Sequence, residues 1–138
     1  MKLQFDDSLA LPDEQYVQEA VPKKQIYIHH TVGGSARSTY SWWLSDKSKS
    51  GGVLKVGTAF LIERDGTIYK CFEPKYWAHH LGLTIAANVR LNRESIGIEL
   101  CSEGALTMKP DGKLYAFDGA RFHRDNFVDL EYEWRGRR

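Results

Sequence analysis

The sequence predicts a single α/β domain, and three observations support this class. Apolar runs rich in β-branched and aromatic residues, typical of strands, occur at 25–30, 56–63, 67–72 and 95–101. A helical pattern follows the first run, and Gly-Gly or Asp-Gly turns separate the elements. The chain of 138 residues has the length of one domain and is long enough to form a hydrophobic core without disulfides or structural metals.

The composition is that of an ordinary soluble globular protein, with 42% hydrophobic and 27% charged residues. A net charge of +1 gives no basic field, so no nucleic-acid partner is expected. No run reaches the roughly 18 apolar residues of a membrane span. Asp6 and Asp7 lie where a signal peptide would need an apolar region. The chain is therefore expected to be cytoplasmic as synthesised.

The first 23 residues are polar and are predicted to form an arm laid over the domain that occupies 24–138. Pro12 and Pro22 break this arm, with one helical turn expected at 13–19. The first strand follows at Gln25–His30. Because this strand is apolar on both faces, it is predicted to be central in the sheet.

A helix is predicted after the Gly33-Gly34 turn, with Ser35 or Ser38 as its cap and its end near Lys49. Three apolar residues share one helical face, which is expected to pack on the core: Tyr40, Trp43 and Leu44. Trp42 points elsewhere, toward a predicted opening of the domain.

A hairpin is predicted next, with strands at 56–63 and 67–72 joined at Asp65-Gly66. The segment 75–94 then reads as a long connection rich in aromatic residues and histidines. A connection of that length is more often functional than filler. Its candidate residues are Tyr76, Trp77, His79 and His80.

The strand predicted at 95–101 carries a carboxylate in an apolar run. Glu99 points to the face opposite that of Ile98 and Leu100, and burying it is costly unless it has a partner or a task. Gly97 would allow a neighbouring backbone to come close. Cys71 and Cys101 both lie in strand-like runs, where two buried thiols and one disulfide both remain open.

The last part of the chain gives fewer signals. A small hairpin is predicted at 107–115 around Pro110-Asp111-Gly112. Residues 116–138 are mixed in character and contain His123. The basic residues at 135–138 read as a solvated end, a weak signal for nucleic acid.

Histidines at a strand end, beside a glycine turn, form the first element of a candidate site. His29 and His30 follow the apolar run and precede Gly33-Gly34. Such a histidine suits a metal ligand or an acid–base group. The other interpretation is structural, with two histidines that are simply hydrogen-bonded at a strand edge. The His-His pair by itself does not distinguish the structural interpretation from the functional one.

Four motifs in order along 24–101 resemble the type-2 N-acetylmuramoyl-L-alanine amidases. This family includes phage lysozymes of amidase type, bacterial recycling amidases and peptidoglycan recognition proteins. The motifs are Ile28-His29-His30-Thr31, the hairpin from Gly57 to Thr67, Trp77-Ala78-His79-His80-Leu81-Gly82, and Asn92 to Leu100. The resemblance implies a mixed sheet flanked by helices, with a zinc ion in a groove on one side.

The resemblance also implies roles for individual residues. His29 corresponds to the first zinc ligand and Glu99 to the general base of the recycling amidases. His79 corresponds to a groove histidine and Asn92 to a residue that orders the preceding loop. The substrate would be the amide between N-acetylmuramic acid and L-alanine in peptidoglycan or a muropeptide. Its predicted contacts are His79, His80, Trp77, Thr31 and Asn92.

Those roles agree with the chemistry of the residue types. Zinc lowers the pKa of a bound water, and a nearby carboxylate can take a proton from that water. His79 or His80 could stabilise the oxyanion. An aromatic side chain would suit the apolar face of a sugar ring, although plain packing explains it equally well. The candidates for that contact are Trp42, Tyr76 and Trp77.

The chain departs from the family pattern at two places. Thr58 stands where the phage branch has a catalytic tyrosine, which favours the branch that relies on Glu99. The family's last helix, last strand and remaining two zinc ligands have no counterpart after Glu99, and the later candidates lack the family's context. Those candidates are His123, Asp125 and Asp129. The sequence therefore reads as the N-terminal part of an amidase domain with an incomplete zinc site.

Two further expectations and two alternative hypotheses accompany this interpretation. An uncovered sheet face should be buried by self-association or by a partner chain. The alternative function is a module that binds muropeptide without cleaving it. An altered zinc set of His29, His79 or His80, and His123 remains a third hypothesis. The expected place of action is the cell wall or the muropeptide pool.

Overall fold

The structure is a computed structural model that describes residues 3–45, 55–116 and 119–122. It divides into two compact units, residues 1–103 and 104–138, where the sequence predicted one domain over 24–138. Each unit is described by itself. None of the helices in the described ranges has the length and apolar character needed to cross a membrane.

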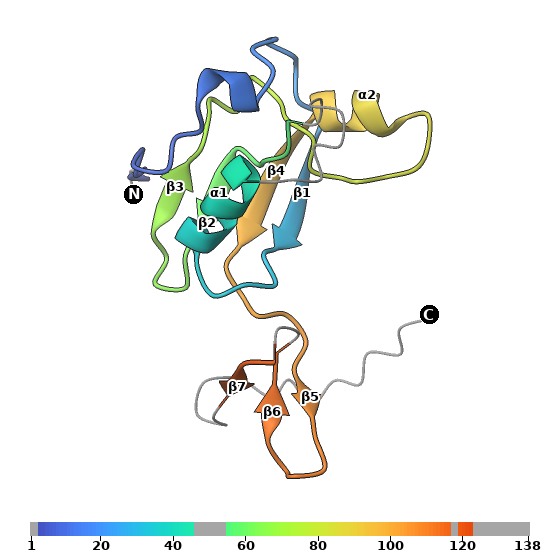
Figure 1. Ribbon diagram of the computed structural model, residues 1–138. Helices are drawn as coiled ribbons and strands as arrows, with labels where there is room; N and C mark the ends of the chain where they lie inside the picture. The colour runs from blue at the N-terminus through green and yellow to red at the C-terminus, as the bar shows by residue number, and fades with distance from the viewer. Residues whose placement is uncertain (1–2, 46–54, 117–118, 123–138) are drawn as a thin grey trace. The chain divides into compact units, whose positions relative to one another are not determined.

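The first unit is built on a four-stranded mixed sheet, which confirms the predicted α/β class (Figure 1). Its strands are β1 (Gln25–His30), β2 (Phe60–Ile62), β3 (Ile68–Lys70) and β4 (Ser95–Leu100), in the order β1-β4-β2-β3. β4 pairs in parallel with β1 and with β2, and β3 is antiparallel to β2. Both strands of the predicted hairpin are present, although shorter than expected.

β1 lies at the edge of this sheet, so the prediction of a central strand was wrong. Its side chains alternate between two environments: Ile26 and Ile28 are 60% and 67% exposed, while Tyr27 and His29 are half-buried. On the neighbouring β4, Leu100 shares the exposed face and is 40% exposed. Apolar residues on both faces of a strand therefore did not imply burial of both faces here.

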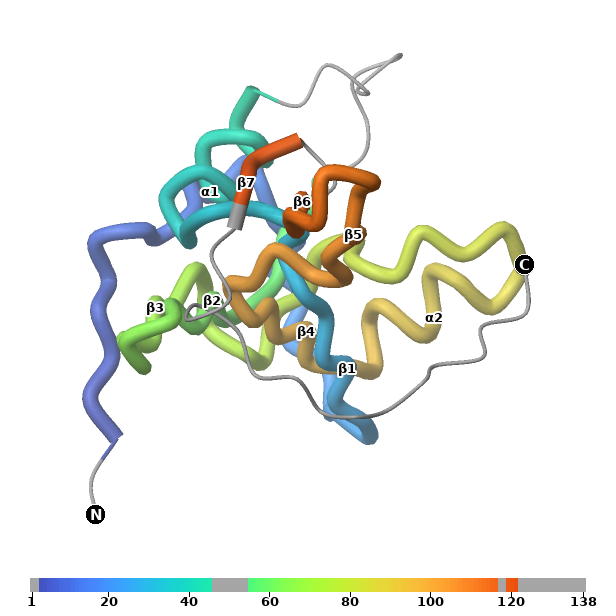
Figure 2. The backbone as a smooth tube through the Cα atoms, turned by 90° about the horizontal axis from the view of Figure 1, so that it is seen from below, coloured from blue at the N-terminus to red at the C-terminus, as the bar shows by residue number. Residues whose placement is uncertain are grey.

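α1 (Ala36–Ser45) lies against one face of the sheet (Figures 1 and 2). Its first turn is capped as predicted, because the Ser38 backbone N–H donates to Ser35 Oγ at 3.2 Å. Trp43 is buried, but Leu44 is 41% exposed, so the predicted core face of the helix is narrower than expected. The predicted helix end near residue 49 lies outside the described residues.

The segment before β1 forms part of the hydrophobic core. Leu9, Leu11 and Tyr16 are buried in one cluster with Leu61 of β2. The 3-10 helix Asp13–Gln15 is the turn predicted at 13–19. Two further members of the cluster are Cys71 and Cys101, which are free, buried thiols. The structure therefore supports two thiols, and not a disulfide.

A second helix, α2 (Asn88–Arg93), lies within the stretch 75–94 that the sequence presented as a connection. The helix is only six residues long, and Ala87 at its N-cap makes no side-chain cap bond. It therefore lacks the capping signature that marks a helix start in a sequence. β4 begins two residues after α2 ends, which places the helix at the start of that strand.

The second unit contains a small antiparallel sheet of three two-residue strands. These are β5 (Thr107–Met108), β6 (Leu114–Tyr115) and β7 (Arg121–Phe122). The predicted hairpin is confirmed by the pairing of β5 with β6, with Gly112 at φ +72° in the turn. β7 was not predicted. His123, Asp125, Asp129 and the basic end lie outside the described residues.

Candidate functional site

The candidate site lies where β1 and β4 run side by side. The parallel register pairs His29 with Glu99, so both side chains point to the same face of the sheet. Leu61 of β2 pairs with Glu99 from the other side and is buried with Trp43 of α1. The face that carries His29 and Glu99 therefore also carries the buried Leu61.

Glu99 is the most perturbed carboxyl group of the site. Its Oε2 atom is buried and has no hydrogen-bond partner among the described residues. Desolvation by burial raises the pKa of Glu99 to about 7. A carboxyl group with a pKa near neutrality can both accept and return a proton under physiological conditions.

His29 contacts His80, which comes from the stretch before α2. His29 Nε2 and His80 Nδ1 are 2.9 Å apart, and the ring centroids are 5.1 Å apart in an edge-to-face arrangement. Burial, with the positive field of His30 second, lowers the pKa of His29. Burial also lowers the pKa of His80 to about 4, with the neighbouring His29 as the next cause. Burial therefore favours the neutral form of both imidazoles.

His80 is held by three residues of α2 and β4. Asn92 is fully buried, and its Oδ1 accepts the backbone N–H groups of His80 and Leu81 at 2.7 and 3.1 Å. Ser95 Oγ lies 2.9 Å from His80 Nε2. A Cβ atom on Gly97 would lie 3.0 Å from His80 Cγ and 2.8 Å from Thr58 Cγ2. Gly97 thus leaves room for the side chains of Thr58 and His80, where a neighbouring backbone was predicted.

His79, which the resemblance assigned to the groove, has different neighbours. Its ring lies edge-to-face against the Trp77 ring, with the two ring centroids 5.4 Å apart. Its Nδ1 atom is buried without a hydrogen-bond partner among the described residues. Trp77 is 8% exposed, and its indole N–H donates to Glu19 Oε2 at 3.0 Å. The structure therefore brings His80, and not His79, to His29. It leaves Trp77 little free surface for a sugar ring.

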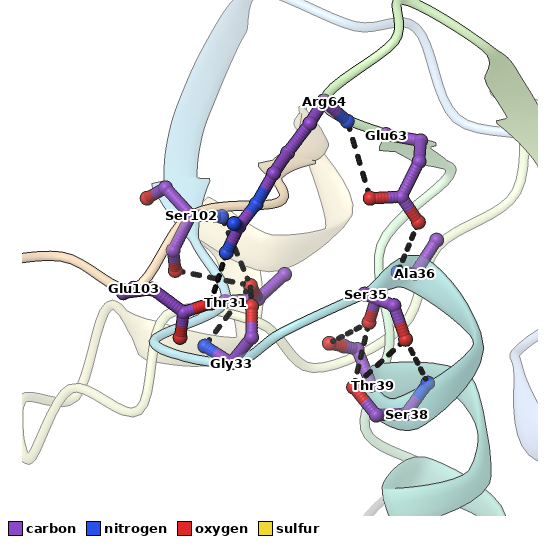
Figure 3. Close-up of polar contacts among 10 residues, drawn as sticks. All are labelled: Thr31, Gly33, Ser35, Ala36, Ser38, Thr39, Glu63, Arg64, Ser102 and Glu103. Carbon is purple, nitrogen blue, oxygen red and sulfur yellow. Dashed lines mark hydrogen bonds and ion pairs between the residues drawn. The ribbon is translucent and has the colours of Figure 1, made fainter. Parts of the chain in front are cut away.

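Thr31 ties the turn after β1 to the segment after β4 (Figure 3). Its hydroxyl donates to the Gly33 carbonyl at 3.0 Å and accepts the Ser102 backbone N–H at 3.4 Å. Beside it, Arg64 forms an ion pair with Glu103 (Figure 3). Thr31 therefore uses its hydroxyl to position the loop that follows the site.

The turn after Thr31 also contains a strained residue. Val32 has φ +50°, a conformation that a β-branched residue rarely adopts. Glu63 Oε2 accepts the Ala36 N–H at 2.8 Å at the start of α1, which fixes the far end of the same turn (Figure 3). Strain held by surrounding contacts is common beside functional sites.

The described residues do not by themselves fit a zinc ion. His29 is a neutral imidazole and suits the metal, but no group of three potential ligands occurs in the described ranges. Structural and catalytic zinc sites need at least three protein ligands. The third hypothesis, with His123 as a ligand, lies outside the described residues.

Ser95 belongs to the site, although its sequence context predicted no role for it. A signal for it was present, because Ser95, Gly97 and Glu99 alternate along one strand and therefore share a face. Thr58, which the resemblance placed at the position of the phage tyrosine, is 1% exposed, and its hydroxyl donates to the Phe60 carbonyl at 2.9 Å. Thr58 therefore acts as a packing residue in this site.

Comparisons with known proteins give one family. No curated protein matches the chain. The solved structure of PGRP-Hd from Alvinella pompejana is similar over 74% of this chain and 66% of its own length, with 12% identity and a TM-score of 0.45. The chain thus spans slightly less than two thirds of that structure. The profile of the N-acetylmuramoyl-L-alanine amidases matches residues 19–126. Since this match covers most of the chain, the protein belongs to the N-acetylmuramoyl-L-alanine amidase family.

Proposed function

We propose that the chain is an N-acetylmuramoyl-L-alanine amidase with Glu99 as its general base. It would hydrolyse the amide between the lactyl group of N-acetylmuramic acid and L-alanine in peptidoglycan or muropeptides. The family supports the substrate class. The observation that carries the proposal is the buried Glu99 Oε2 without a described partner, on the same face as His29.

The environment of Glu99 suits this role. In the proposed reaction, the carboxylate takes a proton from water as the water oxygen attacks the amide carbon. It then returns a proton to the nitrogen as the C–N bond breaks, releasing the lactyl acid and the amine of L-alanine. A base works best when its pKa is close to the operating pH, and burial raises the pKa of Glu99 to about 7.

Zinc remains part of the proposal only as the family's expected cofactor. His29 would be its ligand from the described residues, and no step above passes through the metal. The remaining ligands are not among the described residues. Elemental analysis of the purified protein measures zinc uptake directly.

The experiment is an amidase assay on purified muropeptide, comparing the wild type with Glu99→Gln. Gln keeps the shape and removes the base, so activity should fall by about 10²- to 10⁴-fold while muropeptide binding persists. Glu14→Gln is the matched control, since Glu14 is exposed and distant in sequence from the site. An active wild type that loses nothing on Glu99→Gln would show that Glu99 is not the base.

A second candidate function is muropeptide binding without cleavage. It is favoured by the lack of a three-ligand group among the described residues. Isothermal titration with intact muropeptide separates the two functions. Binding without any release of L-alanine-containing peptide, with zinc added, would support the binding module and contradict the amidase.

A further inference from the structure

The Ser95 hydroxyl has two backbone carbonyl acceptors, of which Leu91 is the nearer and Asn92, at 3.4 Å, the farther. Ser95 Oγ lies 2.6 Å from the Leu91 carbonyl oxygen, near the end of α2. Carbonyl groups in the last turn of a helix have no partner within the helix. A carbonyl oxygen can only accept, so at this distance the Ser95 hydroxyl must donate to Leu91. Ser95 Oγ can then only accept from its other neighbour.

That neighbour is the ring of His80. His80 Nε2 lies 2.9 Å from Ser95 Oγ, so this nitrogen must carry the hydrogen. A neutral imidazole has one N–H and one acceptor nitrogen. His80 Nδ1 is therefore the acceptor, and it lies 2.9 Å from His29 Nε2. The hydrogen in that contact must come from His29.

We propose that Ser95 is a positioning residue that sets the tautomers of both histidines through this chain of hydrogen bonds. His80 and His29 each carry their hydrogen on Nε2, and His29 presents Nδ1 as its acceptor nitrogen. No described residue hydrogen-bonds His29 Nδ1. Ser95 thus determines which nitrogen of His29 can accept a hydrogen bond, a proton or a cation at the site, although it contacts none of them itself.

The chain can set a single tautomer because the His80 ring is fixed on several sides. Asn92 holds the backbone at His80 from α2, and Asn92 Nδ2 is in turn bound to the Asn88 carbonyl at 2.8 Å. The ring lies directly over Gly97, where a Cβ atom would come within 3.0 Å of His80 Cγ. A displaced or rotated ring would lose both 2.9 Å contacts together.

The consequence for catalysis rests on the proposed function, whereas the tautomers can be measured without any activity. The experiment is a long-range ¹H–¹⁵N NMR correlation of the metal-free protein at pH 8, where neutral imidazoles report which nitrogen carries the hydrogen. In the wild type, both His29 and His80 should carry it on Nε2. A wild-type spectrum with His29 protonated on Nδ1 would overturn the proposal, whatever the protein does to muropeptide.

Ser95→Ala tests the role of Ser95 itself. Loss of the acceptor should reduce the preference for the Nε2–H form of His80 by about tenfold, the factor that one hydrogen bond contributes, and His29 should follow. Ser95→Thr keeps a hydroxyl, so His80 and His29 should both retain the Nε2–H form. Ser41→Ala, an exposed serine of α1, is the matched control. Unchanged tautomers in folded Ser95→Ala would show that Ser95 does not set them. If Ser95→Ala fails to fold, the test uses the wild type and Ser95→Thr. A spectrum of either protein with His29 protonated on Nδ1 would overturn the proposal.

Discussion

Glu99 lies directly opposite His29 in the parallel pairing of β4 with β1. Adjacent strands are about 4.8 Å apart, so the register alone brings a carboxyl group and an imidazole to one place on the sheet. The rest of the site is arranged around this pair. α2 and β4 hold His80 against His29, and Thr31 fixes the turn that follows.

The buried carboxyl group of Glu99 should reduce stability at high pH. Its folded pKa, about 7, is above its ordinary value of 4.5. The folded state therefore binds more protons than the unfolded state between these values, and stability falls as pH rises through this window. Glu99→Gln removes the buried charge, so it should raise the free energy of unfolding at pH 8 and change it by almost nothing at pH 4. Because Glu99 is only partly buried, solvent screening limits the expected gain at pH 8 to about 1–2 kcal/mol.

Urea denaturation at the two pH values measures this difference. Glu14→Gln should change the free energy of unfolding by no more than about 0.5 kcal/mol at either pH. An equal effect of Glu99→Gln at pH 4 and pH 8 would mean that the pKa of Glu99 is not raised in the fold.

Gly97 should be intolerant of any side chain. Gly97→Ala would place a Cβ atom 2.8 Å from Thr58 Cγ2 and should cost about 1–3 kcal/mol of stability through overpacking. Thr58→Ser removes that methyl group and should recover part of the loss in the double variant. Gly33→Ala is the control, because its nearest neighbour would be at 3.6 Å. Thermal unfolding of the wild type, the Gly97→Ala and Thr58→Ser variants and the double variant measures the coupling, and strictly additive effects would contradict it.

Zinc uptake by the purified protein should depend on His29. The described residues provide His29 but no group of three ligands, and tight binding requires several fixed ligands together. Elemental analysis after gel filtration should give less zinc per chain in His29→Ala than in the wild type, and equal zinc in both proteins would contradict this role of His29. A value near one that is lost in His29→Ala would show a completed site, with its other ligands outside the described residues or on a neighbouring chain.

The exposed face of β1 and β4 should promote self-association. Ile26, Ile28 and Leu100 are 60%, 67% and 40% exposed on the same face of the sheet. Exposed apolar patches are commonly buried by association. Ile28→Thr should shift the sedimentation profile toward the monomer, whereas Ile85→Thr, an equally apolar exposed change outside the sheet, should not. A wild-type protein that stays monomeric at all concentrations would contradict this prediction.

The sequence by itself predicted the elements whose signals are local. Apolar runs rich in β-branched residues indicated β1 and β4, Asp-Gly indicated the hairpin, and Ser35 or Ser38 indicated the start of α1. The position of Glu99 between Ile98 and Leu100 already predicted that its side chain faces away from theirs. α2 was missed because it is short and has no side-chain cap.

Only the tertiary structure decided which residues meet. His79 and His80 are adjacent in the sequence, so the sequence does not tell which of them faces His29. His80 does so because Asn92 and Ser95 hold it in that position. Likewise, an apolar β1 could have been central or at the edge, because strand order depends on pairing between distant segments. Local patterns determine which elements form and which way a side chain points along them. Neighbours, burial and therefore the pKa of Glu99 arise only when those elements pack together.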